Sequence, residues 1–377
     1  MAEVCVVGAG LIGLGIAYEL AKRGVDVSVF DREEPARAAS WAGAGMLAPF
    51  SEAQPDHAML ALCRDALAVY PAYVEELRER VGVDARFRRE GTLHVALDDV
   101  RLAELAAHLP VFASNGGDVA LLDRAATLAR EPMLAKGCAG ALFVANEAQV
   151  DNRRLGRAMF AACTALGVRF EHVQDVALES DARRVRGLRT ARGFTAAATV
   201  INATGAWAAA LPGVPDRARV PVRPVAGEML AIAVPQSALR ALVWLGHRYL
   251  VPRGDGRLLV GATVVERGFD VRVTAAGLHD LLDAALAVAP ALASFAVVET
   301  WAGLRPGSHD GRPYLGPTAL DGYLVATGHY RNGILLAPLT ARLIADFVVD
   351  GRTDALAPFA ATRVGPEGTA AVPNPAA

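Results

Sequence analysis

The chain has 377 residues, of which 53% are hydrophobic and 21% are charged, and its formal net charge is −2. This length and composition indicate a globular protein with room for two domains, and they exclude an extended disordered chain. The Lys and Arg residues are scattered, so the chain lacks the basic face of a nucleic-acid-binding protein. We therefore expect no nucleic-acid partner.

Several features concern the compartment of the protein. Glu3 stands where a secretory leader would carry a basic residue. The apolar stretch 281–298 contains a charged residue and a proline, so we expect no integral membrane association. The tail, residues 361–377, is rich in Pro, Gly and Ala and is expected to be loose.

The cysteines are far apart and lack metal-binding spacing, which predicts reduced, mostly buried thiols, no metal site and a cytoplasmic location. They are Cys5, Cys63, Cys138 and Cys163.

The N-terminal stretch has the pattern of a dinucleotide-binding unit. The apolar run Val4–Val7 predicts a buried parallel strand, and a glycine turn follows at once. Residues 16–23 predict a helix closed by Gly24, and residues 25–30 predict a second strand that ends at Asp31. The glycines of the turn are Gly8, Gly10 and Gly13.

This turn suits a pyrophosphate. Glycines allow a tight turn, a close approach of the backbone to the phosphates, and close packing of helix on strand. The helix N-terminus supplies free N–H groups and a partial positive charge, and Asp31 can accept hydrogen bonds from ribose hydroxyls. The turn alone does not distinguish NAD from FAD.

The next segment, residues 37–47, consists mostly of small residues, so its backbone can lie against a flat or charged ligand. Ser40 can donate to a phosphate. Asp151 or Asn152 can cap a later helix. A second strand running into a glycine turn, residues 199–207 with Gly205, suggests that the nucleotide-binding domain resumes there.

The remaining elements alternate between strands and helices. Residues 121–132 predict a helix broken at Pro132, and Pro338 leaves open where the last helix begins. Residues 254–256 predict a hairpin turn. Helices are predicted over 60–81, 100–109, 155–166, 274–289 and 339–349. Strands are predicted over 87–97, 141–144, 167–172, 173–179, 185–190, 193–195, 220–233, 249–265, 295–300 and 324–327.

The order of these elements predicts an α/β fold with two interleaved domains. One is a Rossmann-like, doubly wound nucleotide-binding domain, and the other is an antiparallel-sheet substrate domain with its own helices. The first domain is assigned residues 1–75, 145–220 and 300–360. The second is assigned residues 76–144 and 221–299.

Several blocks occur together in a characteristic order: residues 8–13, 42–47, 170–172, 247–252, 261–263, 301–307 and 328–338. With these blocks the chain resembles the D-amino acid oxidase (DAO) family of FAD-dependent amine oxidases, and within it the glycine oxidases of thiamine biosynthesis. The resemblance runs from Val4 to about Phe359. It favours FAD over NAD.

The resemblance implies which residues hold FAD. The flavin is expected to be non-covalent, because no cysteine lies in the blocks near Arg305 or Arg331. The last helix would aim its N-terminus at the pyrimidine side of the flavin ring, where negative charge develops. The implied cofactor-binding residues are Gly8, Gly10, Leu11, Ile12, Gly13, Asp31, Arg32, Ala39, Ser40, Ala44, Gly45, Met46, Val176, Gly205, His329, Tyr330, Arg331, Asn332, Gly333, Ile334 and Leu335.

The resemblance also implies a substrate site. Arg305 would clamp the substrate carboxylate with two parallel hydrogen bonds, and Tyr249 would add a hydroxyl. Arg331 would stand at the mouth of the site. Taken by itself, Arg305 could equally belong to an ordinary ion pair. His247 shares a strand face with Tyr249, although a lone histidine is more often structural. Val264 stands where a methionine can occur in glycine oxidases, and its smaller side chain leaves more room.

The implied reaction is oxidative deamination of glycine by hydride transfer to flavin N5, with molecular oxygen as acceptor. It would give an oxo acid, ammonia and hydrogen peroxide, and it would serve thiamine thiazole synthesis. Sarcosine and small D-amino acids remain open as substrates. No obligatory acid or base is expected, and a homotetramer is what the resemblance suggests. The alternatives are a D-amino acid or sarcosine oxidase, a dehydrogenase with another acceptor, and a non-catalytic FAD-binding subunit.

Overall fold

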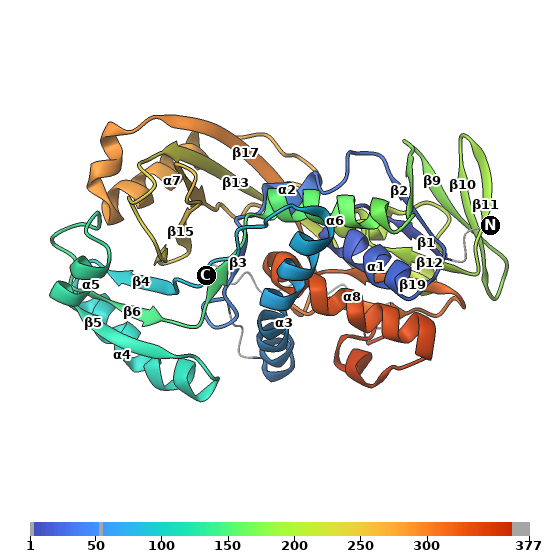
Figure 1. The fold of residues 1–377 in the computed structure, drawn as a ribbon, viewed down its shortest axis with the longest axis horizontal. Coiled ribbons are helices and arrows are strands. Elements are labelled where there is room, and N and C mark those ends of the chain that lie inside the picture. The colour runs from blue at the N-terminus through green and yellow to red at the C-terminus, as the bar shows by residue number, and fades with distance from the viewer. Residues whose placement is uncertain (1–3, 53–55, 364–377) are drawn as a thin grey trace.

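Two large sheets organise the computed structural model, which describes residues 4–52 and 56–363 (Figure 1). Residues 364–377 of the predicted tail lie outside the described residues. The mixed α/β fold class predicted from the sequence is confirmed. The domain limits stay a prediction, although the strands of each sheet do come from several separate parts of the chain.

The six-stranded sheet has the order β18-β19-β12-β1-β2-β8, and all neighbours are parallel except β18 and β19. This arrangement confirms the predicted strand–turn–helix–strand unit at the N-terminus. The strands are β1 (Val4–Val7), β2 (Val27–Asp31), β8 (Arg169–His172), β12 (Thr199–Asn202), β18 (Tyr314–Pro317) and β19 (Tyr323–Thr327).

Both faces of this sheet are covered. Val4 and Val6 belong to a core with the apolar residues of four helices, while Cys5 and Val7 face a second core with a three-stranded sheet. The alternation follows from the period of two along a strand. The helices are α1 (Leu11–Lys22), α3 (His57–Val81), α6 (Asn152–Ala165) and α8 (Gly333–Asp350). The three strands are β9 (Val176–Ser180), β10 (Val185–Thr190) and β11 (Gly193–Ala196).

The eight-stranded sheet has the order β17-β13-β16-β15-β14-β4-β6-β5, with only the β14–β4 pair parallel. Gly254 and Gly256 take positive φ in the turn between β15 and β16, as the hairpin prediction requires. The strands are β4 (Thr92–Ala96), β5 (Val119–Asp123), β6 (Gly140–Val144), β13 (Arg223–Ala233), β14 (Leu242–Leu245), β15 (Arg248–Pro252), β16 (Arg257–Gly261) and β17 (Val297–Gly307).

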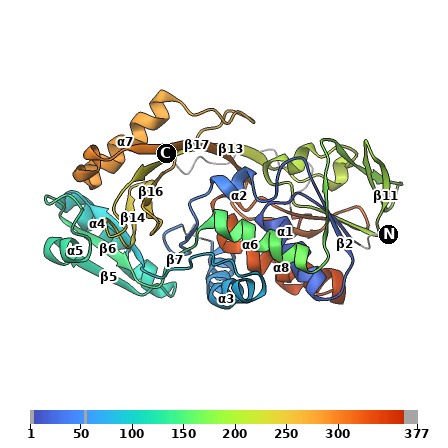
Figure 2. The same ribbon diagram turned by 45° about the horizontal axis from the view of Figure 1, so that its top comes forward.

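The two faces of the eight-stranded sheet have different neighbours. Leu250 and Val260 pack with α7 (Ala275–Val288), whereas Tyr249 and Trp301 on the opposite face pack with Ala42 and Ala44. Figure 2 shows the long strands β13 and β17 extending from the region of α7 toward α2 (Ala38–Ala42). The second face therefore meets the small-residue segment predicted to line a ligand.

The remaining elements are short or lie at the edges of the two sheets. They are β3 (Met46–Leu47), β7 (Ala148–Gln149), α4 (Asp99–Ser114), α5 (Arg124–Arg130) and the 3₁₀ helices η1 (Gly205–Ala210), η2 (Asp216–Ala218), η3 (Pro290–Ser294), η4 (Tyr330–Asn332) and η5 (Asp354–Phe359).

The predicted helix over residues 121–132 is wrong in its first part. Val119–Asp123 forms β5, which pairs antiparallel with β6, and only Arg124–Arg130 is helical. Asp123 accepts a hydrogen bond from Ala126 N at 2.8 Å and so caps the short helix. Pairing with a neighbouring strand overrides the helical propensity of the two leucines.

Several further boundaries differ from the predictions, and three of them lie near the predicted site. The first helix begins at Leu11, directly after the glycine turn, and not at residue 16. β17 continues past residue 300 to Gly307, so the predicted block around Arg305 is a strand. α8 begins at Gly333, well before Pro338, which answers the question that this proline had left open.

By length and composition alone, Tyr330–Asp350 could cross a membrane, and it is the one such segment among the described residues. Its apolar residues, however, join the core between α1 and α3; Leu336, Ala341 and Ile344 are fully buried there. A helix that is apolar because it is buried explains this composition.

Candidate functional site

The glycine turn lies between β1 and α1. Gly8 has φ +105°, and a Cβ on it would come within 2.5 Å of the Ala203 carbonyl oxygen. Leu11 N, in the first turn of α1, donates to Ser40 Oγ at 2.9 Å. The first turn of α1 carries no acidic residue, and Gly10 offers no side-chain cap. This close-packed, glycine-lined helix N-terminus fits a pyrophosphate. The residues present are therefore compatible with the dinucleotide cofactor that the sequence predicts.

Asp31 stands at the end of β2 beside this turn. Its carboxylate accepts hydrogen bonds from Ala9 N at 2.5 Å and from Glu33 N at 2.9 Å. A carboxylate has about four acceptor positions, so two remain for ribose hydroxyls. Arg32, the next residue, lies over the Trp207 ring at 4.6 Å.

Two other predicted cofactor residues come from distant parts of the chain to the same end of the sheet. The β8–β9 connection is tied to Asp31, because Val173 N donates to the Asp31 carbonyl at 2.9 Å, and Val176 begins β9. Gly205, with φ +58°, begins η1 and follows directly on the segment that packs against Gly8. The structure therefore brings the predicted phosphate and ribose residues together.

The segment that contains Ala39, Ser40, Ala44, Gly45 and Met46 is packed against both the last helix and β17. A Cβ on Gly43 would meet Ile334 Cδ1 at 2.6 Å, and a Cβ on Gly303 would meet Ala42 Cβ at 2.4 Å. Trp301 Nε1 also donates to the Ala42 carbonyl at 2.9 Å. These contacts leave room only for small residues at the junction of the two sheets.

Residues 329–335 include the short helix η4 and the first residues of α8. His329 is buried, its Nε2 lies 3.1 Å from Thr340 Oγ1, and burial lowers its pKa to about 3, so the imidazole is neutral at physiological pH. The hydrogen-bond partner of Nε2 is thus a residue of α8 itself. Gly307 pairs with His329 in an isolated bridge, which brings the end of β17 to this segment. The first turn of α8 has no acidic residue and no side-chain cap.

Arg305 lies half-buried on β17. Its Nη1 donates to the carbonyl oxygens of Ala226 at 3.3 Å and Thr263 at 3.2 Å. No carboxylate oxygen of the described residues lies within 4.0 Å of its guanidinium. A Cβ on Gly227 would come within 2.2 Å of Arg305 Nη1, so the guanidinium lies directly over this glycine. An arginine with only carbonyl partners retains donors for an anion.

Arg331, unlike Arg305, has a carboxylate partner. It forms a two-pronged ion pair with Glu52, with Nε–Oε2 at 2.5 Å and Nη2–Oε1 at 3.1 Å. Burial alone would lower the pKa of Arg331, but the Glu52 carboxylate outweighs burial and raises it. The guanidinium also lies 5.6 Å from the Trp244 ring and 5.9 Å from the Tyr249 ring. Its charge is therefore compensated.

The other predicted substrate residues separate into two groups. Tyr249 is buried, and its ring lies 5.4 Å from Trp244 on the sheet face that meets Ala42 and Ala44. Val264 follows Thr263, whose carbonyl accepts from Arg305. The structure thus places both beside the arginines. His247 is exposed in the tight turn before β15, and no described contact links it to these residues.

Sequence reasoning missed Gly227, Glu52 and Trp244. Gly227 carried a usable signal, since a glycine inside a strand often marks a close approach. Nothing in the sequence pairs Glu52 with Arg331, because the two are far apart in the chain.

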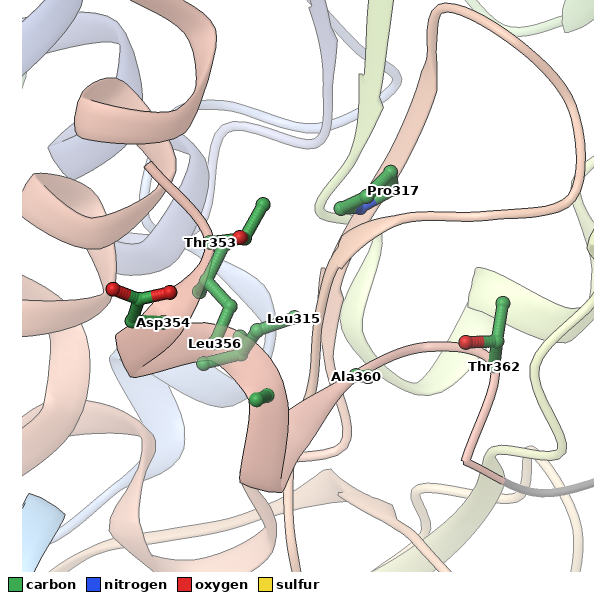
Figure 3. A pocket seen from close by; sticks show the side chains of 8 residues that line it. Leu315, Pro317, Thr353, Asp354, Leu356, Ala360 and Thr362 are labelled. Carbon is green, nitrogen blue, oxygen red and sulfur yellow. The ribbon is translucent and has the colours of Figure 1, made fainter. Parts of the chain in front are cut away.

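One surface cavity among the described residues, with a volume of about 170 Å³, lies elsewhere (Figure 3). Its lining includes Leu315, Leu356 and Thr362, near the end of the described chain. None of the predicted site residues line it, so we do not assign it to the chemistry.

Comparison with known proteins decides the family. The FAD dependent oxidoreductase family (DAO) matches residues 3–347. The chain belongs to this family. It is therefore an FAD-dependent oxidoreductase, and the cofactor predicted from the sequence is confirmed. Its four cysteines are all buried.

Individual relatives cover almost the whole of this family member. A glycine oxidase of Geobacillus kaustophilus is 38% identical over 96% of this chain and 97% of that protein. The bifunctional protein ThiO/ThiG of Trichormus variabilis is 36% identical, over 94% of this chain but 54% of that protein. The crystal structure of the Geobacillus kaustophilus glycine oxidase superposes with a TM-score of 0.90 at 37% identity, over 96% of this chain and 98% of that chain. That of iminodiacetate oxidase from Chelativorans superposes with a TM-score of 0.86 at 29% identity, over 95% of this chain and 98% of that chain.

Proposed function

We propose that this enzyme oxidises glycine in the presence of water to glyoxylate and ammonia, and that oxygen accepts the two electrons as hydrogen peroxide. The observation that carries the proposal is the contrast between two arginines. Arg331 is already neutralised by Glu52, whereas Arg305 has only backbone carbonyls as partners. One uncompensated guanidinium suits a substrate with one carboxylate. The relatives named glycine oxidase support the choice of glycine.

The residues of this chain would act by positioning. Arg305 would hold the carboxylate by paired hydrogen bonds, and the Tyr249 hydroxyl would add a third. This grip fixes the α-carbon and sets its orientation, which is a large contribution to rate. The N-terminus of α8, with no acidic residue in its first turn, would stabilise negative charge at its mouth. Bound FAD supplies the oxidation itself by accepting a hydride from the α-carbon.

Residues of the first sheet would hold the cofactor. The backbone of Gly10, Leu11 and Ile12 would bind the pyrophosphate, and Asp31 the ribose. The backbone of Ala44–Met46 and of residues 329–335 would line the flavin ring. No side chain is assigned as an obligatory acid or base, in keeping with a hydride transfer that needs none.

The test is to mix the purified holoenzyme with glycine without oxygen and follow the visible flavin absorption. We expect glycine to bleach the flavin, and air to restore the colour with release of hydrogen peroxide. Restoration only by a quinone or another acceptor would make the enzyme a dehydrogenase. Failure of glycine, sarcosine and D-alanine to bleach the flavin would refute the proposal.

A second candidate, oxidation of sarcosine or a small D-amino acid, is favoured by Val264. This side chain follows the carbonyl that Arg305 contacts, and it is shorter than methionine. We predict that Val264→Met raises the ratio of kcat/KM for glycine over D-alanine. An unchanged ratio would remove Val264 from the substrate site.

The proposed reaction also suggests a metabolic role. The imine formed from glycine, before its hydrolysis to glyoxylate, can supply thiamine thiazole synthesis, in line with the ThiO/ThiG relative. A cytoplasmic location, non-covalent FAD and a homotetramer stay predictions.

A further inference from the structure

Arg253 is a buried cation between the two sheets. It follows β15 directly, and only 4% of the residue is exposed. Burial lowers the pKa of its guanidinium to about 10, so it keeps its charge at neutral pH. No carboxylate oxygen of the described residues lies within 4.0 Å of it. A buried charge with no carboxylate in direct contact depends on its hydrogen bonds for compensation.

Those hydrogen bonds go to two acceptors. Arg253 Nη1 donates to the Val150 carbonyl at 2.6 Å, and Nη2 donates to Asn152 Oδ1. Because arginine can only donate, the Asn152 oxygen must face it and the Asn152 NH₂ group must face away. The orientation of this amide is therefore fixed by the arginine.

The residues that supply these two acceptors also form hydrogen bonds with the small-residue segment. Asn152 Nδ2 donates to the carbonyls of Ser40 at 2.7 Å and Trp41 at 3.1 Å. Val150 N donates to the Gly45 carbonyl at 2.8 Å. A Cβ on Gly45 would lie 2.0 Å from Val150 O and 2.8 Å from Arg253 Nη1, so the backbone there is pressed onto both groups.

The same chain of contacts reaches the predicted pyrophosphate site. Ser40 Oγ accepts from Leu11 N at the start of α1, where the pyrophosphate would bind. We propose that Arg253 is a positioning residue that holds the segment Ser40–Gly45 in place for FAD through Val150 and Asn152. The proposal rests on FAD binding and not on the choice of glycine as substrate.

The test compares two Arg→Lys variants of one hairpin. Lysine keeps the charge but cannot span two acceptors as a guanidinium does. We expect Arg253→Lys to weaken FAD binding to the refolded apoprotein by roughly tenfold to a hundredfold and to shift the visible spectrum of the bound flavin. The control is Arg257→Lys, on the next strand, because Arg257 is partly exposed and lysine can keep its ion pair with the partly exposed Asp255. It should bind FAD within about twofold of wild type.

A second variant keeps the proposal falsifiable if Arg253→Lys does not fold. Asn152→Ser removes the donors to Ser40 and Trp41 and leaves the arginine in place. We expect the same loss of FAD affinity and the same spectral shift. If either folded variant has a lower Tm as apoprotein but an unchanged Kd for FAD and an unchanged flavin spectrum, Arg253 is structural only and the proposal is overturned. Because no substrate is used, this outcome is independent of whether glycine is oxidised.

Discussion

The Tyr70 hydroxyl donates a hydrogen bond to the carbonyl of Ile334 at 2.7 Å. In a regular helix this carbonyl would accept from the backbone N–H of residue 338, but that residue is Pro338 and has no N–H. Tyr70 lies on α3 and is fully buried. A side chain from another helix thus supplies the donor that the sequence of α8 lacks, and α8 can begin before its proline.

This relationship predicts the effect of Tyr70→Phe. The substitution leaves the buried Ile334 carbonyl without its donor, and we expect it to lower the free energy of unfolding by about 1–3 kcal/mol. Tyr73→Phe is the matched control, because Tyr73 is equally buried on the same helix and its hydroxyl has no hydrogen-bond partner among the described residues. Denaturant unfolding of the apoproteins measures both. Equal effects of the two substitutions would contradict our account of Tyr70.

The sequence was most informative where physical constraints are local. The turn Gly8–Gly13, the cap at Asp151 and the hairpin turn at residues 254–256 follow from short-range rules, and the structure contains all three. Where the structure of a segment depends on a residue far away in the chain, the sequence did not predict it. Tyr70 supplies the donor that Pro338 removes from α8, and β5 forms by pairing with β6.

The same distinction applies to the candidate site. Arg305 was found through a motif that resembles a known family. The ion pair between Arg331 and Glu52 was not predicted, because the two residues are far apart in the sequence and meet only in the folded chain. Local spacing cannot predict which arginine is neutralised, yet in our proposal this sets how many carboxylates the site can accept.

Gly227 makes the position of Arg305 testable without changing the arginine. In Gly227→Ala the new methyl group would overlap the guanidinium, since the Cβ would lie within 2.2 Å of Nη1. We expect kcat/KM for glycine to fall by at least about tenfold while FAD stays bound, because the displaced guanidinium can no longer pair with the carboxylate. Gly137→Ala is the control, since a Cβ there would meet nothing within 4 Å. Normal kinetics of Gly227→Ala would contradict the expectation that the substrate requires the guanidinium at its present position over Gly227.

The Arg331–Glu52 pair predicts a change in specificity. Glu52→Gln removes the charge that neutralises Arg331, so a second guanidinium becomes available for a second carboxylate. We expect the ratio of kcat/KM for iminodiacetate over glycine to rise by about tenfold. Glu75→Gln, which removes an exposed partner of Arg78 on α3, should leave the ratio unchanged. A ratio that stays at the wild-type value in Glu52→Gln would mean that Arg331 does not face the substrate.

Glu147 predicts a dependence of stability on pH. It is fully buried and accepts hydrogen bonds from Phe50 N at 2.9 Å, Ser51 N at 2.7 Å and Ser51 Oγ at 2.6 Å. Burial raises its pKa from 4.5 to about 7, although the hydrogen bonds from Ser51 oppose this shift. Between these two pH values the folded state binds more protons than the unfolded state, so this group's contribution to stability is full below pH 4.5 and is lost as the pH rises through 7.

Glu147→Gln removes this titration while keeping the size and one acceptor of the side chain. Its free energy of unfolding should therefore rise relative to that of wild type between pH 5 and pH 8, by about 1 kcal/mol or more. Urea unfolding of both proteins across this range measures the difference. A difference in stability that does not vary with pH would show that Glu147 is ionised in the folded protein throughout this range.

The hydrogen bonds of Glu147 hold the residues just before Glu52, so Glu147→Gln should also weaken the Arg331–Glu52 pair. We expect it to raise the ratio of kcat/KM for iminodiacetate over glycine, in the direction expected for Glu52→Gln.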